Sequence, residues 1–367
     1  MCLIRQISIV SVALLATLCK VAFADETQPI SYEVLEIEGL ADDALNYQEP
    51  SKDKFTNGGI FKGFHLGGYS SAGITIPRKG NNEIAINEFS LILTWENDSR
   101  FRFFGELEFE TPLTWNDEDQ LNTKRSLVDL ERLYVDYNFS EKINFRGGRF
   151  LTPTGRWNQL HASPLVWTST RPLATSRLFP MSTNGVMALG AFPVAGKPFE
   201  YTVFIETLQD QIEDRDEIKF KDVKGARFAF GQSFNVGVNL LSFTERSIPN
   251  LNFANASYRL LGVDFISHYK NIEFLGEAFQ RWDSSNKDGG SGAYLQTAVP
   301  LPYLNNWYGI ARLEYLNRPA EKRTERWLIG ATWLIKPAKL LKLEFTGGSG
   351  DQPESPRGFL ASFAVLF

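Results

Sequence analysis

One stretch of the sequence concentrates side chains that could bind oxygen anions. Residues 151–184 contain Arg156, Arg171 and Arg177 together with His161, and they contain no Asp or Glu. The hydroxyl side chains of this stretch are Thr152, Thr154, Ser163, Thr168, Ser169, Thr170, Thr175, Ser176, Ser182 and Thr183. Guanidinium groups and hydroxyls offer several hydrogen-bond donors to phosphate or carboxylate oxygens, without a competing negative charge. This composition favours contact with small anions.

A second set of charged residues lies in segments where polar and apolar residues alternate. Its members are Glu88, Arg102, Glu106, Glu108, Arg132, Asp136, Arg146, Arg227 and Arg312. Around Asp136, for example, the apolar residues Leu133, Val135, Tyr137 and Phe139 recur at every second position. Such alternation is typical of a β-strand with one polar and one apolar face. The charges are therefore expected on a single face of their strands.

Alternation of this kind recurs from Ile60 onward and predicts an all-β protein of about sixteen strands. The expected strands are 60–69, 84–96, 101–110, 128–139, 143–150, 185–192, 199–207, 223–231, 234–243, 260–269, 271–281, 292–299, 306–316, 326–335, 340–348 and 358–367. An even number of strands is typical of a bacterial transmembrane barrel, which keeps its charges on the lumen side because a charge facing lipid at mid-bilayer costs about 2 to 4 kcal/mol. A soluble periplasmic sandwich also alternates and is the alternative.

The expected connections alternate between short and long, which favours an antiparallel transmembrane barrel with its long loops outside. Short turns are expected after every second strand, for example at 232–233. Long polar loops are expected after the others, at 70–83, 111–127, 151–184, 208–222 and 244–259.

The N-terminus has the pattern of a secretory signal peptide. Arg5 precedes an apolar run at 7–18, and the small residues Ala22 and Ala24 form a cleavage pattern. We expect cleavage near Ala24. Both cysteines of the chain lie within this segment, so no disulfide is expected in the exported protein.

The remainder divides into an acidic N-terminal extension, 25–58, and a barrel domain, 59–367. The extension is rich in Asp and Glu, and the whole chain has a formal net charge of -5. A chain without a basic surface is not expected to bind nucleic acid.

The C-terminal strand carries a family resemblance. It ends in Phe363, Val365 and Phe367 on one face, which resembles the C-terminal insertion signal of Gram-negative outer-membrane barrels. Together with the signal peptide and the sixteen strands, this makes the chain similar to the bacterial porins. A narrower region, 146–155, is similar to the G-(R/K)-x-x-x-P-x-G region of the phosphate-selective porins.

This resemblance implies a channel in the outer membrane for small hydrophilic or anionic solutes. It also implies contacts with outer-membrane lipid and lipopolysaccharide, insertion by the barrel assembly machinery, and a possible homotrimer. The connection 151–184 lies where porins have the third external loop, which folds inward and narrows the pore.

Two arrangements of charge are open for such a constriction. Arg156, His161, Arg171 and Arg177 could focus a positive field and favour anions. Alternatively, these cations could pair with acidic wall residues, which would leave a field across the pore and weak selectivity. The wall residues available for pairing are Glu88, Glu106, Glu108 and Asp136.

No enzyme motif is complete. His65, His161 and His268 are widely spaced in a chain without exported cysteines, so no metal site and no cofactor are expected. A barrel hydrolase that uses Ser and His from separate strands is the enzyme alternative, and a closed barrel that acts as a receptor is a third possibility.

Overall fold

The computed structural model describes residues 63–96, 99–209, 219–246, 255–319, 321–336, 338–350 and 356–367. The predicted signal peptide, 1–24, and the acidic extension, 25–58, lie outside the described residues. Within the described parts of the chain, no helix is long and apolar enough to cross a membrane.

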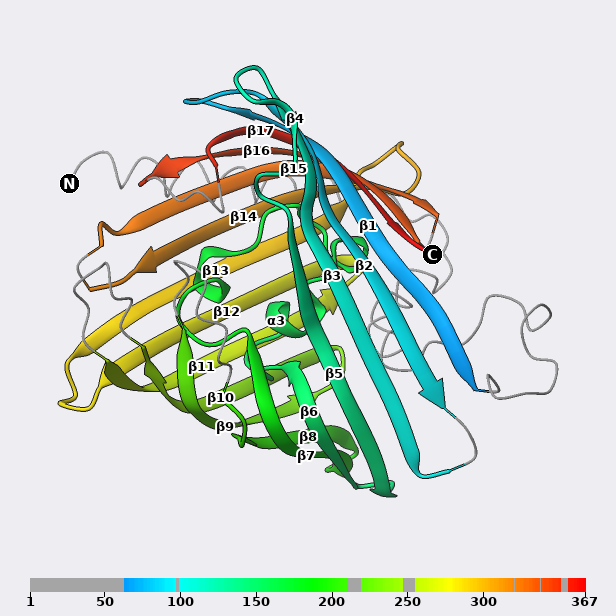
Figure 1. Ribbon diagram of the computed structural model, residues 1–367, viewed down its shortest axis with the longest axis vertical. Helices are drawn as coiled ribbons and strands as arrows, with labels where there is room; N and C mark the ends of the chain where they lie inside the picture. The colour runs from blue at the N-terminus through cyan, green and yellow to red at the C-terminus, as the bar shows by residue number, and fades with distance from the viewer. Residues whose placement is uncertain are drawn as a thin grey trace.

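Most of the described chain is β-strand (Figure 1). The strands are β1 (Phe64–Pro77), β2 (Glu83–Glu96), β3 (Phe101–Asn116), β4 (Gln120–Asn122), β5 (Leu127–Ser140), β6 (Ile143–Leu151), β7 (Ser182–Val194), β8 (Lys197–Glu206), β9 (Phe220–Gly231), β10 (Phe234–Glu245), β11 (Ala256–Tyr269), β12 (Ile272–Asp283), β13 (Asp288–Pro300), β14 (Trp307–Asn317), β15 (Thr324–Lys336), β16 (Lys339–Ser349) and β17 (Gly358–Leu366).

These strands form one closed antiparallel barrel. Apart from β4, each strand pairs with the next one in sequence, so that β3 pairs with β5, and the ring closes where β1 pairs with β17, from Tyr69 opposite Leu366 to Pro77 opposite Gly358. The short strand β4 pairs only with β3 and extends the β3–β5 hairpin beyond the wall. The described wall therefore has sixteen strands, as the alternation predicts.

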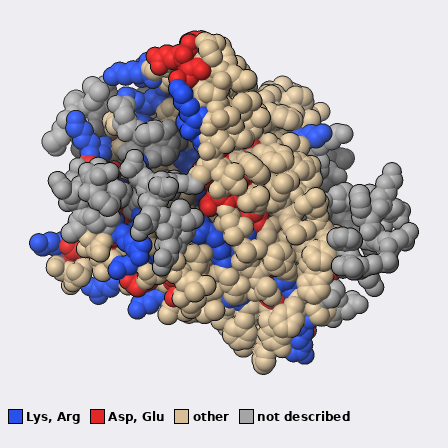
Figure 2. All heavy atoms as spheres, in the orientation of Figure 1, with Lys and Arg blue, Asp and Glu red and all other residues tan. Residues whose placement is uncertain are grey.

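The barrel is apolar outside and charged inside. Outward-facing side chains such as Phe101, Val135 and Phe345 are 43 to 48 % exposed. Figure 2 shows that the face over β1, β2 and β3 is mainly uncharged, whereas charged residues gather at the end of the barrel near β4. By contrast, Glu106 and Arg312 are each only 1 % exposed inside the wall.

The connections differ at the two ends of the barrel, as expected. One end has tight turns, such as the one at Lys270 and Asn271, whose φ angles of 49° and 64° match a two-residue hairpin turn. The other end has the longer connections, including the segment between β6 and β7.

Two predicted boundaries were wrong. The first strand does not end at 69, because β1, which begins at Phe64, continues to Pro77. The long loop expected at 70–83 is therefore only 78–82. Likewise, the loop expected at 111–127 is partly strand, because β3 continues to Asn116. Ser70, Ser71 and Gly73 mask the alternation in β1, and pairing with β2 and β17 determines its length instead.

Candidate functional site

The segment 152–181, between β6 and β7, lies inside the barrel. It contains α3 (Trp157–Leu160) and two 3-10 turns, η2 (Ser163–Leu165) and η3 (Leu173–Thr175). Figure 1 shows α3 surrounded by the strands of the wall. Hydrogen bonds join this segment, here called the inner loop, to wall strands from β10, through Asn239, to β17, through Ser362. The inner loop therefore folds into the lumen.

The start of the inner loop is held by a buried carboxylate on β12. The Glu277 Oε1 atom accepts hydrogen bonds from the backbone N–H groups of Arg156 (2.9 Å) and Trp157 (2.7 Å), and from the Tyr294 hydroxyl (2.9 Å). Gly155 adopts φ +67°, and a Cβ there would lie 2.1 Å from Glu277 Oε2. A glycine at this turn is what lets the backbone approach the carboxylate.

The middle of the inner loop is held by buried charges on β14 and β16. Arg312 donates to the Thr170 backbone oxygen (2.9 Å) and hydroxyl (2.8 Å), and Lys342 donates to the Ser163 backbone oxygen (2.6 Å). Glu344 accepts from the Thr170 hydroxyl (3.0 Å). A buried charge has lost its hydration and is costly unless it forms hydrogen bonds. The hydrogen bonds from these wall residues to the loop supply that compensation.

The end of the inner loop is apolar. Leu173, Leu178 and Phe179 are at most 2 % exposed, and the Phe179 ring packs 5.0 Å from that of Phe279 on β12. Gly292 on β13 leaves the space in which Leu178 fits, because a Cβ there would lie 3.0 Å from the Leu178 side chain. This packing fixes the loop against the wall and narrows the lumen from that side.

Two of the predicted constriction arginines form ion pairs with carboxylates. Arg156 lies 3.2 Å from Asp264, which also binds Arg227 at 2.7 Å. Arg177 lies 3.9 Å from Glu321. Pairing with acidic residues was one of the two expectations, but Asp264 and Glu321 were not among the partners proposed from the sequence.

The other two constriction candidates, Arg171 and His161, also contact polar groups of the barrel or the loop. Arg171 donates to Asn158 (2.6 Å) and to the Thr175 backbone oxygen (3.1 Å), and burial lowers its pKa to about 10. His161 Nε2 lies 3.0 Å from Glu131 on β5. Burial lowers the pKa of His161, but the nearby Glu131 charge more than offsets this effect, so its pKa is raised overall.

The wall formed by β3, β5 and β6 carries charges paired across neighbouring strands. Arg132 pairs with Glu106, and Arg146 pairs with Asp136 at 2.7 Å. These four residues were predicted to face the lumen, and the structure places them there as two opposite-charge pairs.

Aromatic rings support the same arginines. The rings of Phe104 and Tyr134 stack at 5.1 Å, with Arg132 over Phe104 (4.6 Å) and Arg146 over Tyr134 (3.7 Å). A guanidinium over a ring face is held by cation–π attraction. The four side chains form a continuous column along the inner wall.

The remaining wall candidates lie on the same inner face. Arg102 pairs with Glu96 at 2.8 Å, and Glu88 accepts a hydrogen bond from Ser71 at 3.1 Å. Arg312, predicted to line the pore, is instead covered by the inner loop.

Two of the predicted insertion residues, Phe363 and Val365, lie on the outer face of β17, and Phe367 follows this strand. Phe363 and Phe367 are exposed, with Val365 between them in the sequence. Phe367 exchanges backbone hydrogen bonds of 2.8 Å with Gly68, and its ring stacks on Phe89. The terminal residue therefore contributes to barrel closure.

Sequence reasoning missed the residues that hold the inner loop, among them Asp264, Glu277, Lys342 and Glu344. Each alternates with apolar neighbours, so its inward direction could have been predicted, but its contact with the loop could not. Glu131 had a local signal, because the alternation slips by one residue between Leu130 and Leu133.

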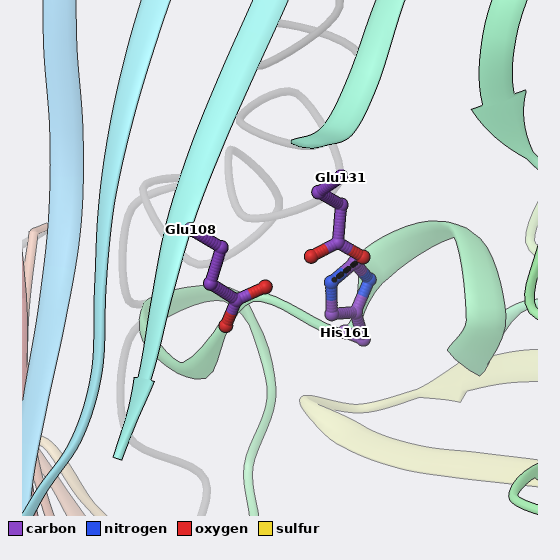
Figure 3. A group of neighbouring side chains, drawn as sticks. All are labelled: Glu108, Glu131 and His161. Atoms are coloured by element: carbon purple, nitrogen blue, oxygen red, sulfur yellow. Dashed lines mark ion pairs between the residues drawn. The ribbon is translucent and has the colours of Figure 1, made fainter. Parts of the chain in front are cut away.

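One group of side chains could hold a metal ion. Glu108, Glu131 and His161 offer ligand atoms within 4.8 Å of one another, and Figure 3 shows them converging from β3, β5 and the end of α3. It is the one such group in the described residues. None was expected from the sequence, because the three residues are far apart along the chain.

Known proteins resemble this chain weakly in sequence and more broadly in structure. No family model matches the sequence. An uncharacterized protein of Aquifex aeolicus is 30% identical over 136 residues, which are 36% of this chain and 30% of that protein. The chain thus matches less than a third of that relative's length.

Solved structures match over far more of the chain. The anion-selective porin from Comamonas acidovorans matches 83% of this chain and 98% of its own, with a TM-score of 0.55 and 12% identity. The fold is that of the Gram-negative outer-membrane porins.

Two further structures agree with this porin fold. The loop L8 deletion mutant of OmpT, an outer membrane protein of Vibrio cholerae, matches 83% of this chain and 99% of its own, with a TM-score of 0.57 and 9% identity. OmpF of Salmonella typhi matches 83% and 97%, with a TM-score of 0.53 and 10% identity.

Proposed function

We propose that this protein is an outer-membrane channel for passive diffusion of small hydrophilic solutes and ions. The observation that carries the proposal is the distribution of side chains in the barrel. Its outer face exposes residues such as Leu133, Val135 and Phe345, whereas its charges lie inside. A soluble protein rarely exposes apolar surface of this extent, whereas a barrel that spans lipid requires it.

The inner loop gives the proposed channel its constriction. A sixteen-stranded barrel has a lumen too wide for side chains to fill. The inner loop bonds to β12, β14 and β16, packs on β13 and touches the β3–β5 wall where His161 meets Glu131. Solutes would pass beside this contact, along the paired arginines of β5 and β6.

For ion preference we propose weak selectivity. Arg156 and Arg177 each pair with a carboxylate, and the wall arginines Arg132 and Arg146 do so too. Paired charges give a field across the pore rather than a net positive potential. A preference for anions, phosphate included, is the alternative; the arginine content of the inner loop supports it.

Assembly and location follow the same proposal. We expect the mature chain in the Gram-negative outer membrane, in contact with lipopolysaccharide and inserted by the barrel assembly machinery. A homotrimer is also proposed, since one of the matched structures of Vibrio cholerae OmpT is described as a trimer form.

Liposome swelling tests the proposal. Vesicles that contain the refolded protein and a trapped polymer should swell in solutions of small sugars, at rates that fall as the sugar becomes larger. Vesicles that hold correctly folded barrel but do not swell would contradict a diffusion channel and favour a closed receptor barrel. Release of fatty acid from the vesicle lipid would favour the hydrolase alternative.

A further inference from the structure

Glu108, Glu131 and His161 come together only through the fold. Glu108 is on β3, Glu131 is on β5, and His161 follows α3 in the inner loop. Figure 3 shows the two carboxylates and the imidazole directed toward one another. This cluster is where the inner loop meets the β3–β5 wall.

A β-bulge aims Glu131 into the cluster. In the β3–β5 register, Glu106 is opposite Arg132 and Leu107 is opposite Leu130, so Glu131 is an extra residue without a cross-strand partner. Both Glu131 and Arg132 therefore face the lumen, in a strand that would otherwise direct only one of them inward. Bulges of this kind commonly re-aim a side chain at a functional site.

His161 lies 3.0 Å from Glu131 and can offset the charge of only one of the two carboxylates in this cluster. Glu108 is 7 % exposed and forms no ion pair with any described residue, and the Glu131 carboxylate lies beside it. The neighbouring guanidinium of Arg132 already pairs with Glu106. Two adjacent carboxylates shielded from water are costly unless a proton or a cation lies between them.

His161 supplies a second and independent indication. Both of its ring nitrogens are shielded from solvent and form no hydrogen bond in the described part of the chain, and Nε2 is the one that lies 3.0 Å from the Glu131 carboxylate. A buried nitrogen without a partner costs about 1 to 3 kcal/mol, so such a group calls for an explanation. A cation bound through Nε2 would give that nitrogen a partner.

We propose that Glu108, Glu131 and His161 bind one divalent transition-metal cation, of which Zn²⁺ is the representative. Imidazole nitrogen combined with carboxylate oxygen suits zinc and its neighbours better than calcium or magnesium, which prefer oxygen ligands alone. Three protein ligands leave a position for water. Ligands about 2 Å from the metal lie about 3.3 Å apart in a tetrahedral site, so the side chains must close by rotation.

The bound cation would fasten the inner loop to the β3–β5 wall. Glu277, Arg312, Lys342 and Glu344 hold the loop to β12, β14 and β16, on the other side of the lumen. The cation would thus join two strands and the loop across the constriction. Binding does not require the protein to conduct, so this inference can fail while the channel proposal holds, and the reverse.

Metal content and calorimetry of the refolded full-length mature protein test the inference. We expect one equivalent of Zn²⁺ per chain after dialysis, with affinity at least 10-fold weaker in Glu131→Gln and His161→Gln. The matched control is His268→Gln, because His268 lies 3.4 Å from the Glu273 carboxylate and outside the three-residue group. This variant should bind Zn²⁺ as the parent does.

Several outcomes would overturn the site. These are a parent protein that binds no Zn²⁺, equal binding by the parent and His161→Gln, or loss of binding in the His268→Gln control alone. A protonated imidazole paired with Glu131, and no metal, would then explain the cluster. If the variants fail to fold, the visible spectrum of the Co²⁺-loaded parent decides instead, because nitrogen and oxygen ligation in a low-coordinate site gives intense absorption and hydrated Co²⁺ does not.

Discussion

At the residue scale, the inner loop depends on a few buried contacts. The close approach of the Gly155 backbone to Glu277 is the one that leaves the least space for a side chain. Its φ is +67°, and a Cβ at this position would lie 2.1 Å from Glu277 Oε2, which leaves no room for a side chain. Gly196 has a similar φ of +75° but nothing within 4 Å. Substitutions at these two glycines therefore distinguish the cost of backbone strain, which both share, from the cost of a steric conflict, which only Gly155 has.

We predict that Gly155→Ala destabilises the protein more than Gly196→Ala does. Both variants should lose about 1 kcal/mol through the left-handed backbone. Gly155→Ala should lose a further ~1 to 3 kcal/mol, because Glu277 must abandon its backbone donors. Guanidinium unfolding of both variants in detergent measures this difference, and equal midpoints would contradict the role assigned to Glu277.

Arg312 gives a second prediction at this scale. Arg312→Ala removes the donors to Thr170 and leaves Glu314 buried without its ion-pair partner, so stability should fall by about 3 to 5 kcal/mol. Solute entry into vesicles should become faster as the loop loosens. The control is Arg102→Ala, whose pair with Glu96 is largely exposed and should contribute less than about 1 kcal/mol.

At the element scale, the strands were largely predictable and the exceptions have local causes. Alternation placed all sixteen wall strands, because each has one face toward the lumen and one away from it. It failed in β1, where small residues such as Gly67 and Gly73 remove the contrast between faces. It also missed the bulge at Glu131, although the alternation slips by one residue between Leu130 and Leu133.

The outer face of β5 gives a prediction that depends on lipid. Leu133 faces outward in mid-strand, so Leu133→Arg should cost about 2 to 4 kcal/mol for folding into a bilayer. Leu121 lies on β4, beyond the wall, and is 64 % exposed. Leu121→Arg should therefore fold as the parent does. Comparable folding yields for both variants in vesicles would place the apolar face of β5 outside the hydrocarbon.

At the scale of the whole molecule, the fold could be predicted but the interior could not. The polar face of each strand is local information, and closure of the barrel follows from the number and pairing of strands. The partners of the inner loop are separated from it along the chain by up to 193 residues, as for Ser169 and Ser362. Asp264 and Glu321, rather than Glu88 or Asp136, pair with the loop arginines because of this long-range arrangement.

The central claim is that the charged interior of this barrel is a water-filled passage. Planar-bilayer recording of the refolded protein across a KCl gradient tests it most directly. We predict discrete conductance steps and a reversal potential near zero, because Arg132, Arg146, Arg156 and Arg177 are each paired with a carboxylate. A folded barrel that produces no steps would contradict the channel, and a strongly anion-selective reversal potential would contradict the charge pairing.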